Sequence, residues 1–386
     1  MRKVCVVITA RASYSRIKTV LSHLAVRKDI ELQIVAAASA LVDRAGRVTE
    51  VIKQDGFTVT EEVSSLVEGD SSLQMAQTTG LGLIEISSVL KRLKPDVVVT
   101  IADRYETIAT AIAASYLRIP LVHIQGGEIT GNIDEKVRHA VTKLADIHLV
   151  ATKKSQENVI AMGERTETVF LTECPSIDIA KGVEKRRPLD FSPFEKYGGV
   201  GKEIDLSKNY LVVMQHPVTS ETDLARTHVF NTLSVISRLG IPTMWFWPNV
   251  DAGADGTSKE IRRYREHNDS SHIHFFKNMS PEDFLVLINN CSVLIGNSSV
   301  GIREAGFLGV PVVNIGTRQT GREYAENVVH SGYEVKELQE SILRQLEHGR
   351  YVSSSLYGSG NAGLKISEVI ATTKLTTDKK LFFSDV

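Results

Sequence analysis

Acidic residues follow two neighbouring apolar runs of this 386-residue sequence, at the point where each run ends. Val97–Ile101 leads through one alanine to Asp103, and Leu121–Ile124 leads into a segment that ends Gly-Gly-Glu128, with Asp134 six residues further on. Ligands of open α/β sheets bind beyond the carboxyl ends of the strands, so these carboxylates are candidates for general acid or base catalysis. The alternative for Asp103 is that it caps the N-terminus of the following helix.

Residues suited to binding phosphate follow other apolar runs. Arg11 comes just after the first run, among small residues whose N–H groups could help a guanidinium to hold an anion. Ser298 and Ser299 precede a predicted helix start that suits a diphosphate, and Glu304, one turn further on, could accept hydrogen bonds from a ribose. The alternative for Arg11 is a surface arginine beside an ordinary helix start. The alternative for the serine segment is a serine-capped helix in which Glu304 is exposed to solvent.

Candidate phosphate-binding residues also follow two more of the predicted strands. His216 follows Tyr210–Met214 and suits a phosphate contact or a proton donor, although a single histidine is more often structural. Arg318 follows Val312–Ile315 and is a second arginine after a strand. Both residues join the candidates for a site at the carboxyl ends of the strands.

Short runs rich in β-branched residues alternate with helical patterns along the chain. This rhythm predicts parallel sheets covered by helices on both faces, with Tyr105–Leu117 as one of the helices. Charge, proline and glycine gather at Glu184–Pro188 and Gly198–Gly201, where we place a linker between two similar α/β domains with a cleft between them. The predicted strands are Val4–Ile8, Leu32–Val35, Val97–Ile101, Leu121–Ile124, His148–Val150, Val169–Leu171, Tyr210–Met214, Thr243–Trp247, Ile273–Phe276, Val293–Ile295 and Val312–Ile315.

Composition excludes several classes of protein. The length favours two domains, and a formal net charge of −1 leaves no basic surface for nucleic acid or an anionic membrane. No apolar stretch approaches the roughly 18 residues that a membrane span requires. Three cysteines far apart predict no disulfide framework and favour a cytoplasmic location. We also expect no metal site, because His267, His272 and His274 lack partners at a spacing typical of zinc.

Several segments together carry a resemblance to one family: Asp103–Glu106, His123–Asp134 with Arg138 and His139, Cys174–Asp178, His216–Thr219, and Gly296–Glu304 with Gly316–Gln319. They resemble the hydrolysing UDP-N-acetylglucosamine 2-epimerases, which supply N-acetylmannosamine for sialic-acid-type sugars. The resemblance covers most of the chain. It implies an α/β protein of GT-B fold, with two Rossmann-like domains, the active site in the interdomain cleft, and the nucleotide held mainly by the C-terminal domain. We expect domains at 1–185 and 186–362, and a segment at 363–386 that crosses back to the N-terminal domain.

Carried over residue by residue, the resemblance implies roles for the candidates. In several members a third catalytic acid stands where this sequence has Gln125, whose amide cannot transfer a proton at neutral pH. Either Glu128 takes over that role or Gln125 only orients the substrate. The other implied roles are phosphate contacts for Arg11, Ser298, Ser299 and Arg318, the ribose for Glu304, the glycosidic phosphate for His216, the sugar or phosphates for Asn249, substrate binding for Arg104, and catalytic acids at Asp103 and Asp134.

The reaction that the resemblance implies eliminates UDP across C1–C2 to give 2-acetamidoglucal and then adds water. It needs a carboxylate base, a carboxylate that stabilises positive charge and cations at the leaving diphosphate, but neither NAD nor a metal. We therefore expect a homodimeric or homotetrameric enzyme that converts UDP-N-acetylglucosamine to N-acetylmannosamine and UDP without a cofactor. The alternatives are the same reaction on a UDP-2,4-diacetamido-2,4,6-trideoxyhexose for legionaminic acid, a non-hydrolysing epimerase, a GT-B glycosyltransferase, and a catalytically silent UDP-sugar-binding module.

Overall fold

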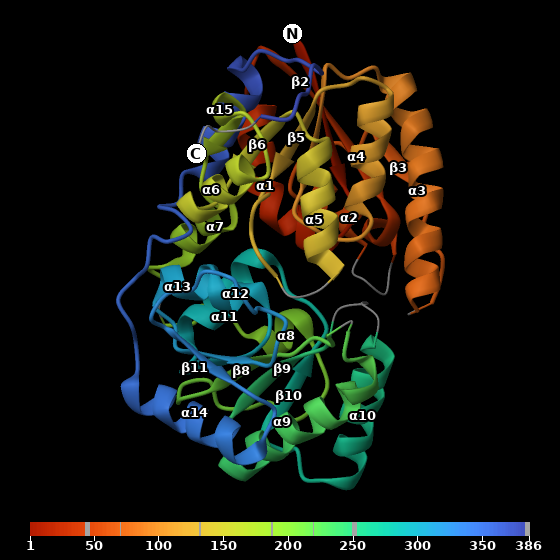
Figure 1. Ribbon diagram of the computed structural model, residues 1–386. Coiled ribbons are helices and arrows are strands. Elements are labelled where there is room, and N and C mark those ends of the chain that lie inside the picture. Colours follow the sequence, from red (N-terminus) through yellow and green to blue (C-terminus); the bar gives the residue numbers. More distant parts are fainter. Residues whose placement is uncertain are drawn as a thin grey trace. The chain divides into compact units, whose positions relative to one another are not determined.

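The chain forms two compact units, each built around one parallel β-sheet (Figure 1). The computed structural model describes residues 1–42, 47–69, 71–130, 133–186, 188–218, 220–248 and 253–382. Unit 1 comprises Met1–Ile129, Ile133–Asp178 and Tyr357–Val386, and unit 2 comprises Thr130–Asn132 and Ile179–Leu356. The division between Asp178 and Ile179 falls inside helix α7 (Ser176–Val183).

Unit 1 contains the strands β1 (Arg2–Ile8), β2 (Ile30–Ala37), β3 (Glu61–Val63), β4 (Val97–Ile101), β5 (Leu121–Ile124), β6 (Ile147–Val150) and β7 (Val169–Leu171). Its helices are α1 (Arg11–Ala25), α2 (Val48–Gln54), α3 (Ser72–Leu93), α4 (Thr107–Tyr116), α5 (Ile133–Leu144), α6 (Lys153–Ala161) and α15 (Ala362–Thr372). The strands are all parallel and lie in the order β3-β2-β1-β4-β5-β6-β7. The carboxyl ends of β1 and β4 therefore form the switch point, where open α/β sheets bind their ligands.

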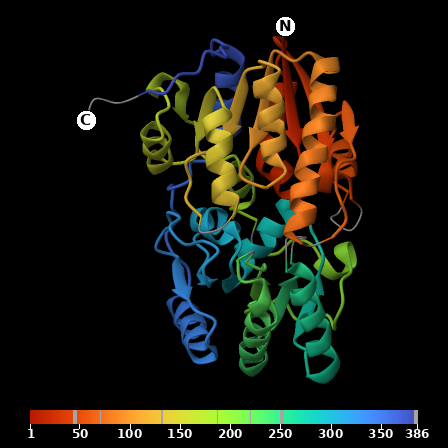
Figure 2. The same ribbon diagram turned by 45° about the vertical axis from the view of Figure 1, so that its right-hand side comes forward.

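Both faces of this sheet are buried, which explains why its central strands are continuous apolar runs. Val4, Val6 and Ile8 of β1 belong to one apolar cluster, with residues of α1, α2 and α15. Cys5 and Val7 belong to the other cluster, with residues of α3, α4 and α5. Figures 1 and 2 show these last three helices side by side.

Unit 2 contains the strands β8 (Leu211–Met214), β9 (Thr243–Phe246), β10 (Ile273–Phe276), β11 (Val293–Gly296), β12 (Val312–Ile315) and β13 (Val328–Ser331). Its helices are α8 (Pro193–Tyr197), α9 (Ala225–Leu239), α10 (Ala254–His267), α11 (Pro281–Asn290), α12 (Ser299–Ile302), α13 (Glu304–Leu308) and α14 (Val335–His348). The parallel sheet has the order β10-β9-β8-β11-β12-β13, so its switch point lies between β8 and β11. Residues of α9, α10 and α14 pack with the strands in one apolar cluster.

All the strands predicted from the sequence are present, with ends that differ by up to two residues. The sequence did not predict β3 and β13, each of which is one of the two outer strands of its sheet. β3 is only three residues long and begins Glu-Glu, and β13 ends His-Ser. Their partly exposed polar residues interrupt the apolar run that reveals a buried strand, whereas the other outer strands, β7 and β10, keep enough apolar residues to be predicted. The predicted helix at Tyr105–Leu117 is α4.

Helix α15, near the end of the chain, packs on α1 of unit 1. Its first turn is held by Asp178, whose two carboxylate oxygens accept hydrogen bonds from the backbone N–H groups of Ala362 (2.8 Å) and Gly363 (2.7 Å). A carboxylate at this position satisfies N–H groups that have no partner within the helix. A Cβ atom on Gly363 would lie 2.9 Å from the backbone carbonyl of Thr19 in α1, so the two helices approach closely there.

We predict that Gly363→Ala destabilises the protein by about 1–3 kcal/mol, because the added methyl group overpacks a backbone contact. Gly80→Ala is the matched control: Gly80 lies within α3, and a Cβ atom there would meet nothing within 4 Å. The control should be more stable than the wild type by roughly 0.5–1 kcal/mol. Urea denaturation followed by circular dichroism measures both, and effects of the same sign would show that α15 does not require glycine at 363.

Candidate active site

The buried guanidinium group of Arg138 connects the loops that follow two neighbouring strands of unit 1. Arg138 lies on α5 and is 1% exposed. Its Nη2 donates to Oδ2 of Asp103, just after β4, and its Nη1 donates to the carbonyl oxygen of Glu128, after β5 (2.8 Å). A buried ion pair with further hydrogen bonds fixes side-chain positions, because removing either partner leaves an uncompensated charge.

Arg16, from α1, adds a second cation beside Asp103. Its Nη1 lies 3.8 Å from Oδ1 of Asp103. The alternative interpretation of Asp103 as a helix cap is wrong, because α4 begins at Thr107 and its N-cap position is Glu106. The carboxylate instead lies between two guanidinium groups at the end of β4.

The other two acidic candidates lie around the same arginine. Asp134 is on the first turn of α5, four residues before Arg138, and side chains with this spacing share a helix face. Glu128 is only 4% exposed, and its own carbonyl binds Arg138. Arg138 thus binds the carboxylate of Asp103 and the backbone carbonyl of Glu128, and Asp134 lies one turn earlier on the same helix.

Two basic candidates of unit 1, Arg11 and Arg104, lie in the segments that follow β1 and β4. Arg11 is the first residue of α1. Arg104 forms two hydrogen bonds with the buried carboxylate of Glu106, from Nε to Oε2 (3.1 Å) and from Nη2 to Oε1 (3.2 Å). Ser39 Oγ donates to the same carboxylate (3.2 Å). Arg104 therefore also stabilises the loop that carries Asp103.

Gln125 is buried at the end of β5, with a positive φ of 65°. Its Nε2 donates to Sγ of Cys174 (2.9 Å), and that sulfur lies 3.0 Å from Oγ of Ser176. Among the described residues its Oε1 has no hydrogen-bond partner. An amide in this setting can orient a neighbouring group but cannot transfer a proton.

Sequence reasoning missed His123, which lies within β5 and is fully buried. Its Nε2 donates to the carbonyl oxygen of Ala102 (2.9 Å), and its Nδ1 accepts from Oγ1 of Thr142 (3.1 Å). Burial lowers the pKa of His123 to about 4, although the hydrogen bond to Ala102 acts in the opposite direction. Ala102 has a φ of 65° and directly precedes Asp103, so a neutral imidazole fixes the turn that aims this carboxylate. The sequence feature that could have indicated a role for His123 is a histidine inside an otherwise apolar strand.

In unit 2, the side chain of Asn297 joins the loops that follow the two central strands. It accepts from the backbone N–H of His216 (2.7 Å) and donates to the carbonyl of the same residue (2.8 Å). His216 follows β8, Asn297 follows β11, and both are buried. The preceding Gly296 has a φ of 137°, and a Cβ atom there would lie 2.0 Å from the carbonyl oxygen of Met214, so only glycine fits between these strands.

The loop that follows β12 also contacts Asn297. Gln319 Nε2 (2.8 Å) and Arg318 Nη1 (3.3 Å) donate to the backbone carbonyl of Asn297. Three strand ends of unit 2 thus meet at one asparagine, which sequence reasoning did not single out. The candidate Asn249 lies outside the described residues.

The serine segment after β11 begins a helix, as predicted, but this helix is short. Ser298 caps it by accepting from the N–H of Val300 (3.5 Å), Ser299 is its first residue, and α12 ends at Ile302. Glu304 begins the separate helix α13 and is 9% exposed. Among the described residues its Oε2 has no hydrogen-bond partner. Glu304 is therefore not the solvent-exposed glutamate of the alternative interpretation.

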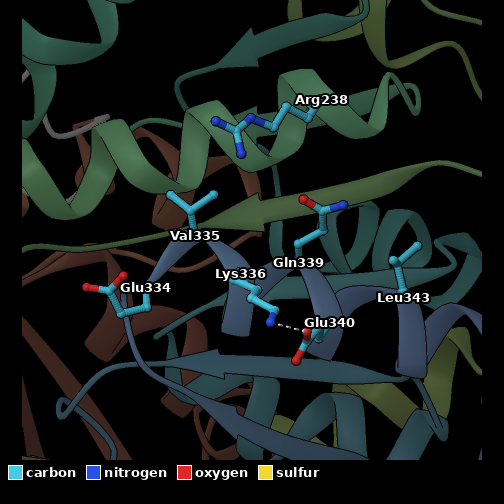
Figure 3. A pocket seen from close by; sticks show the side chains of 7 residues that line it. All are labelled: Arg238, Glu334, Val335, Lys336, Gln339, Glu340 and Leu343. Atoms are coloured by element: carbon cyan, nitrogen blue, oxygen red, sulfur yellow. Dashed lines mark ion pairs between the residues drawn. The ribbon is translucent and has the colours of Figure 1, made fainter.

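A pocket of about 560 Å³ lies elsewhere on unit 2, between α9 and α14 (Figure 3). An ion pair of 4.0 Å between Lys336 and Glu340 lies at its surface. None of the candidate residues lines this pocket, so it is not part of the candidate site.

Within the described ranges, no group of three or more histidine, cysteine, aspartate or glutamate side chains could hold a metal ion. In the same part of the chain, no helix is both long and apolar enough to cross a membrane.

Comparisons with known proteins agree with this architecture. The family model described as UDP-N-acetylglucosamine 2-epimerase matches residues 22–371. A Legionella pneumophila protein described as UDP-N,N'-diacetylbacillosamine 2-epimerase (hydrolyzing) is 30% identical over 375 residues, which cover 97% of each chain. A UDP-N-acetylglucosamine 2-epimerase of Neisseria meningitidis is 27% identical over 361 residues, 94% of this chain and 92% of that protein.

A solved structure resembles the whole fold. The crystal structure of Methanocaldococcus jannaschii UDP-GlcNAc 2-epimerase in complex with UDP-GlcNAc and UDP superposes with a TM-score of 0.79 at 17% identity, and the match covers 96% of this chain and 100% of that chain. The predicted class, two Rossmann-like domains of GT-B type, is confirmed. The chain belongs to the UDP-N-acetylglucosamine 2-epimerase family. The roles of the individual site residues stay predictions.

We predict that the burial of His123 makes the stability of unit 1 depend on pH. The folded-state pKa of about 4 lies below the usual value of 6.5, so the unfolded state binds more protons between these values and stability falls as the pH drops from 6.5 towards 4. His123→Asn should remove roughly 2–3 kcal/mol of the loss between pH 7 and pH 4.5.

Urea denaturation followed by circular dichroism at the two pH values gives this difference. The control is His267→Asn, on the exposed end of α10, which should keep the wild-type pH dependence. If His123→Asn also keeps it, the imidazole does not stay neutral in the folded protein.

Proposed function

We propose that this protein is a hydrolysing epimerase that converts UDP-N-acetylglucosamine to N-acetylmannosamine and UDP. Family membership supports the 2-epimerase chemistry, and the description of the Legionella relative as hydrolyzing supports release of the free sugar. The observation that carries the proposal lies at the strand ends, where a ligand of such a sheet binds. There the buried Arg138 binds the Asp103 carboxylate and the Glu128 carbonyl, and Asp134 lies one turn earlier on its helix.

The first half of the reaction is an elimination. The C2 proton of the sugar is only weakly acidic, so cleavage of the C1–O bond must run ahead, which makes the ring carbon cationic and the proton easier to remove. UDP leaves with the electron pair of that bond, a carboxylate takes the proton from C2, and 2-acetamidoglucal remains. Asp103, Glu128 and Asp134 are the candidates for this base and for the carboxylate that stabilises the positive charge.

The second half is a hydration. The hydroxyl group of water adds to C1, and a proton returns to C2 from the opposite face, which gives the 2-epimer with a free reducing end. Glu128 is the acid that can replace the glutamate that the resemblance implies at position 125, because Gln125 is an amide held against Cys174.

The nucleotide is assigned to residues of unit 2, with Arg11 of unit 1 as a further phosphate contact. Ser298, Ser299 and Arg318 serve the diphosphate, and Glu304 accepts from the ribose hydroxyls. The ring of His216 donates a proton or a hydrogen bond to the leaving phosphate. The buried carboxylate of Glu304 supports this assignment, because its Oε2 has no hydrogen-bond partner in the part of the chain that the structure describes and so suits a ligand that brings hydroxyl donors.

A second candidate is the same reaction on a UDP-diacetamido-trideoxyhexose. The Legionella relative, whose description names UDP-N,N'-diacetylbacillosamine, favours it. The two substrates differ at C4 and C6, so a direct comparison of turnover decides between them.

Incubation of the purified protein with each UDP-sugar tests the function. Free UDP with the unlinked 2-epimer is the expected result, and the sugar that turns over faster is the substrate. A UDP-linked epimer would establish the non-hydrolysing reaction, transfer that depends on an acceptor would establish a glycosyltransferase, and binding without turnover would establish a silent module.

We predict that Asp103→Asn and Asp134→Asn each lower kcat by about 10²–10⁴-fold, the usual effect of losing a positioned acid or base, while UDP still binds. Gln125→Ala should have a milder effect, because only orientation is lost. Solvent deuterium at C2 of the product, measured for each variant, reports the proton transfer. Absence of deuterium in the wild-type product would exclude the elimination, and loss of turnover in Gln125→Ala alone would contradict this division of roles.

We predict that Glu304→Ala weakens UDP binding about tenfold or more, since a hydrogen bond to a charged group contributes about 1.5–3 kcal/mol. Isothermal titration calorimetry with UDP measures the effect. Glu340→Ala, whose side chain is 67% exposed on α14, is the control and should bind like the wild type. Unchanged affinity in Glu304→Ala would remove this residue from the nucleotide site.

A further inference from the structure

The segment that follows α15 is anchored to unit 1 by a lysine. Lys379 Nζ lies 2.5 Å from Oε2 of Glu164 and donates to the backbone carbonyls of Ala145 and Thr142, the latter at 3.4 Å. These carbonyls belong to the C-terminal end of α5, where a cation is favourable. Lys379 therefore contacts the end of the helix that carries Asp134 and Arg138.

The anchor is an ion pair with a buried carboxylate. Glu164 is 4% exposed and also accepts from Lys143 Nζ (2.6 Å) and His148 Nε2 (3.0 Å). Burial alone would raise the pKa of Glu164, but the hydrogen bonds from His148, Lys143 and Lys379 outweigh it and lower the pKa to about 2. The carboxylate is thus charged at neutral pH, and loss of Lys379 removes one of its two lysine partners.

A second contact holds the same segment in place. The backbone N–H of Phe382 donates to the carbonyl of Gly163 (3.0 Å). Leu381 packs closely on Gly163: a Cβ atom added to Gly163 would lie 2.4 Å from Cδ1 of Leu381. Lys379 therefore belongs to a segment with a defined path over unit 1.

A series of hydrogen bonds leads from this anchor to the candidate catalytic loop. Thr142, whose carbonyl accepts from Lys379, donates through Oγ1 to Nδ1 of His123 (3.1 Å). His123 donates through Nε2 to the carbonyl of Ala102 (2.9 Å), the residue with positive φ that precedes Asp103. Each group in this series is buried or part-buried, so its hydrogen bonds have little competition from water.

We propose that Lys379 is a positioning residue for the candidate acid Asp103, which it reaches through Thr142, His123 and Ala102. The C-terminal segment is then part of the scaffold of the active site. The kinetic part of this inference rests on the proposed function, whereas its structural part does not.

Hydrogen exchange measured by mass spectrometry tests the structural part without any substrate. Lys379→Met should speed exchange of the backbone amides of residues 101–106, at the end of β4 and in the loop after it. Exchange of residues 296–302, from the end of β11 through α12, should stay unchanged. Lys380→Met is the matched control, since Lys380 is a neighbour in the same segment with a 68% exposed side chain and a distant ion pair of 3.9 Å. Unchanged exchange at 101–106 in Lys379→Met would overturn the proposal.

Thr142→Val keeps the test decisive if Lys379→Met does not fold. This variant removes the hydroxyl that reaches His123 and leaves the C-terminal segment intact, so it should speed exchange at residues 101–106 as well. Thr142→Ser keeps the hydroxyl and should behave like the wild type. Equal exchange in the two Thr142 variants would overturn the connection through His123.

Steady-state kinetics test the functional part. Lys379→Met should lower kcat about tenfold or more with KM and UDP affinity within about twofold, and Lys379→Arg should recover part of the loss, because an arginine keeps the cation. In the double variant with His123→Gln, Lys379→Met should lower kcat little further, because both substitutions interrupt the same series of hydrogen bonds to the Asp103 loop.

The outcomes separate this proposal from the proposed function. A normal kcat with only a lower melting temperature, or losses that multiply in the double variant, would overturn the positioning role. Absence of turnover in the wild type with either UDP-sugar would overturn the proposed function instead, and the exchange at residues 101–106 would still decide whether Lys379 positions the loop.

Discussion

The contact between Arg138 and Asp103 is the interaction on which the candidate site of unit 1 depends. A guanidinium group that is 1% exposed needs partners for its charge and its N–H groups, and it finds them in the Asp103 carboxylate and the Glu128 carbonyl. Because those partners follow β4 and β5, the arginine links the loops after these two strands. Asp134, one helical turn before it, is placed by the same helix. One buried cation thus contacts the Asp103 carboxylate and the Glu128 backbone from the helix that also carries Asp134.

In unit 2 a neutral side chain, that of Asn297, connects the loops that follow neighbouring strands. Asn297 exchanges two hydrogen bonds with the backbone of His216 and accepts through its own carbonyl from Arg318 and Gln319. An amide can both donate and accept, so it can match a backbone N–H and C=O at once without a charge to compensate. Asn297 thus adds no charge of its own to the site that we propose for the diphosphate. In unit 1, by contrast, the structural partner is itself one of the candidate acids.

The sequence predicts the sheets and the strand ends well, because both depend on local pattern. A strand buried on both faces must be apolar throughout, as Val4–Ile8 is, and a polar residue directly after such a run has to lie at the carboxyl edge. Arg138, His123 and Asn297 were not recognised as determinants of the site, since a buried polar residue looks like any other in sequence until its partners from distant segments are known. His123 and Ala102 are 21 positions apart, and His216 and Asn297 are 81 apart. The strands β3 and β13 were missed because partly exposed polar residues, Glu-Glu in β3 and His330 in β13, interrupt the apolar run.

Gln125 shows how the surroundings of a residue limit its chemistry. Its amide is buried between strand β5 and Cys174, and its Nε2 donates to a sulfur, which is a weak acceptor. A glutamate placed there would bring a charge against that sulfur, and a buried carboxylate without a cation is strongly disfavoured. The resemblance nevertheless implies a third catalytic acid near the sugar. Glu128, three residues further along the same loop and joined to Arg138 through its backbone, is the group that the local structure can offer for it. The change at position 125 is therefore consistent with a transfer of the acid function along the loop, from the end of the strand to its Gly-Gly-Glu turn.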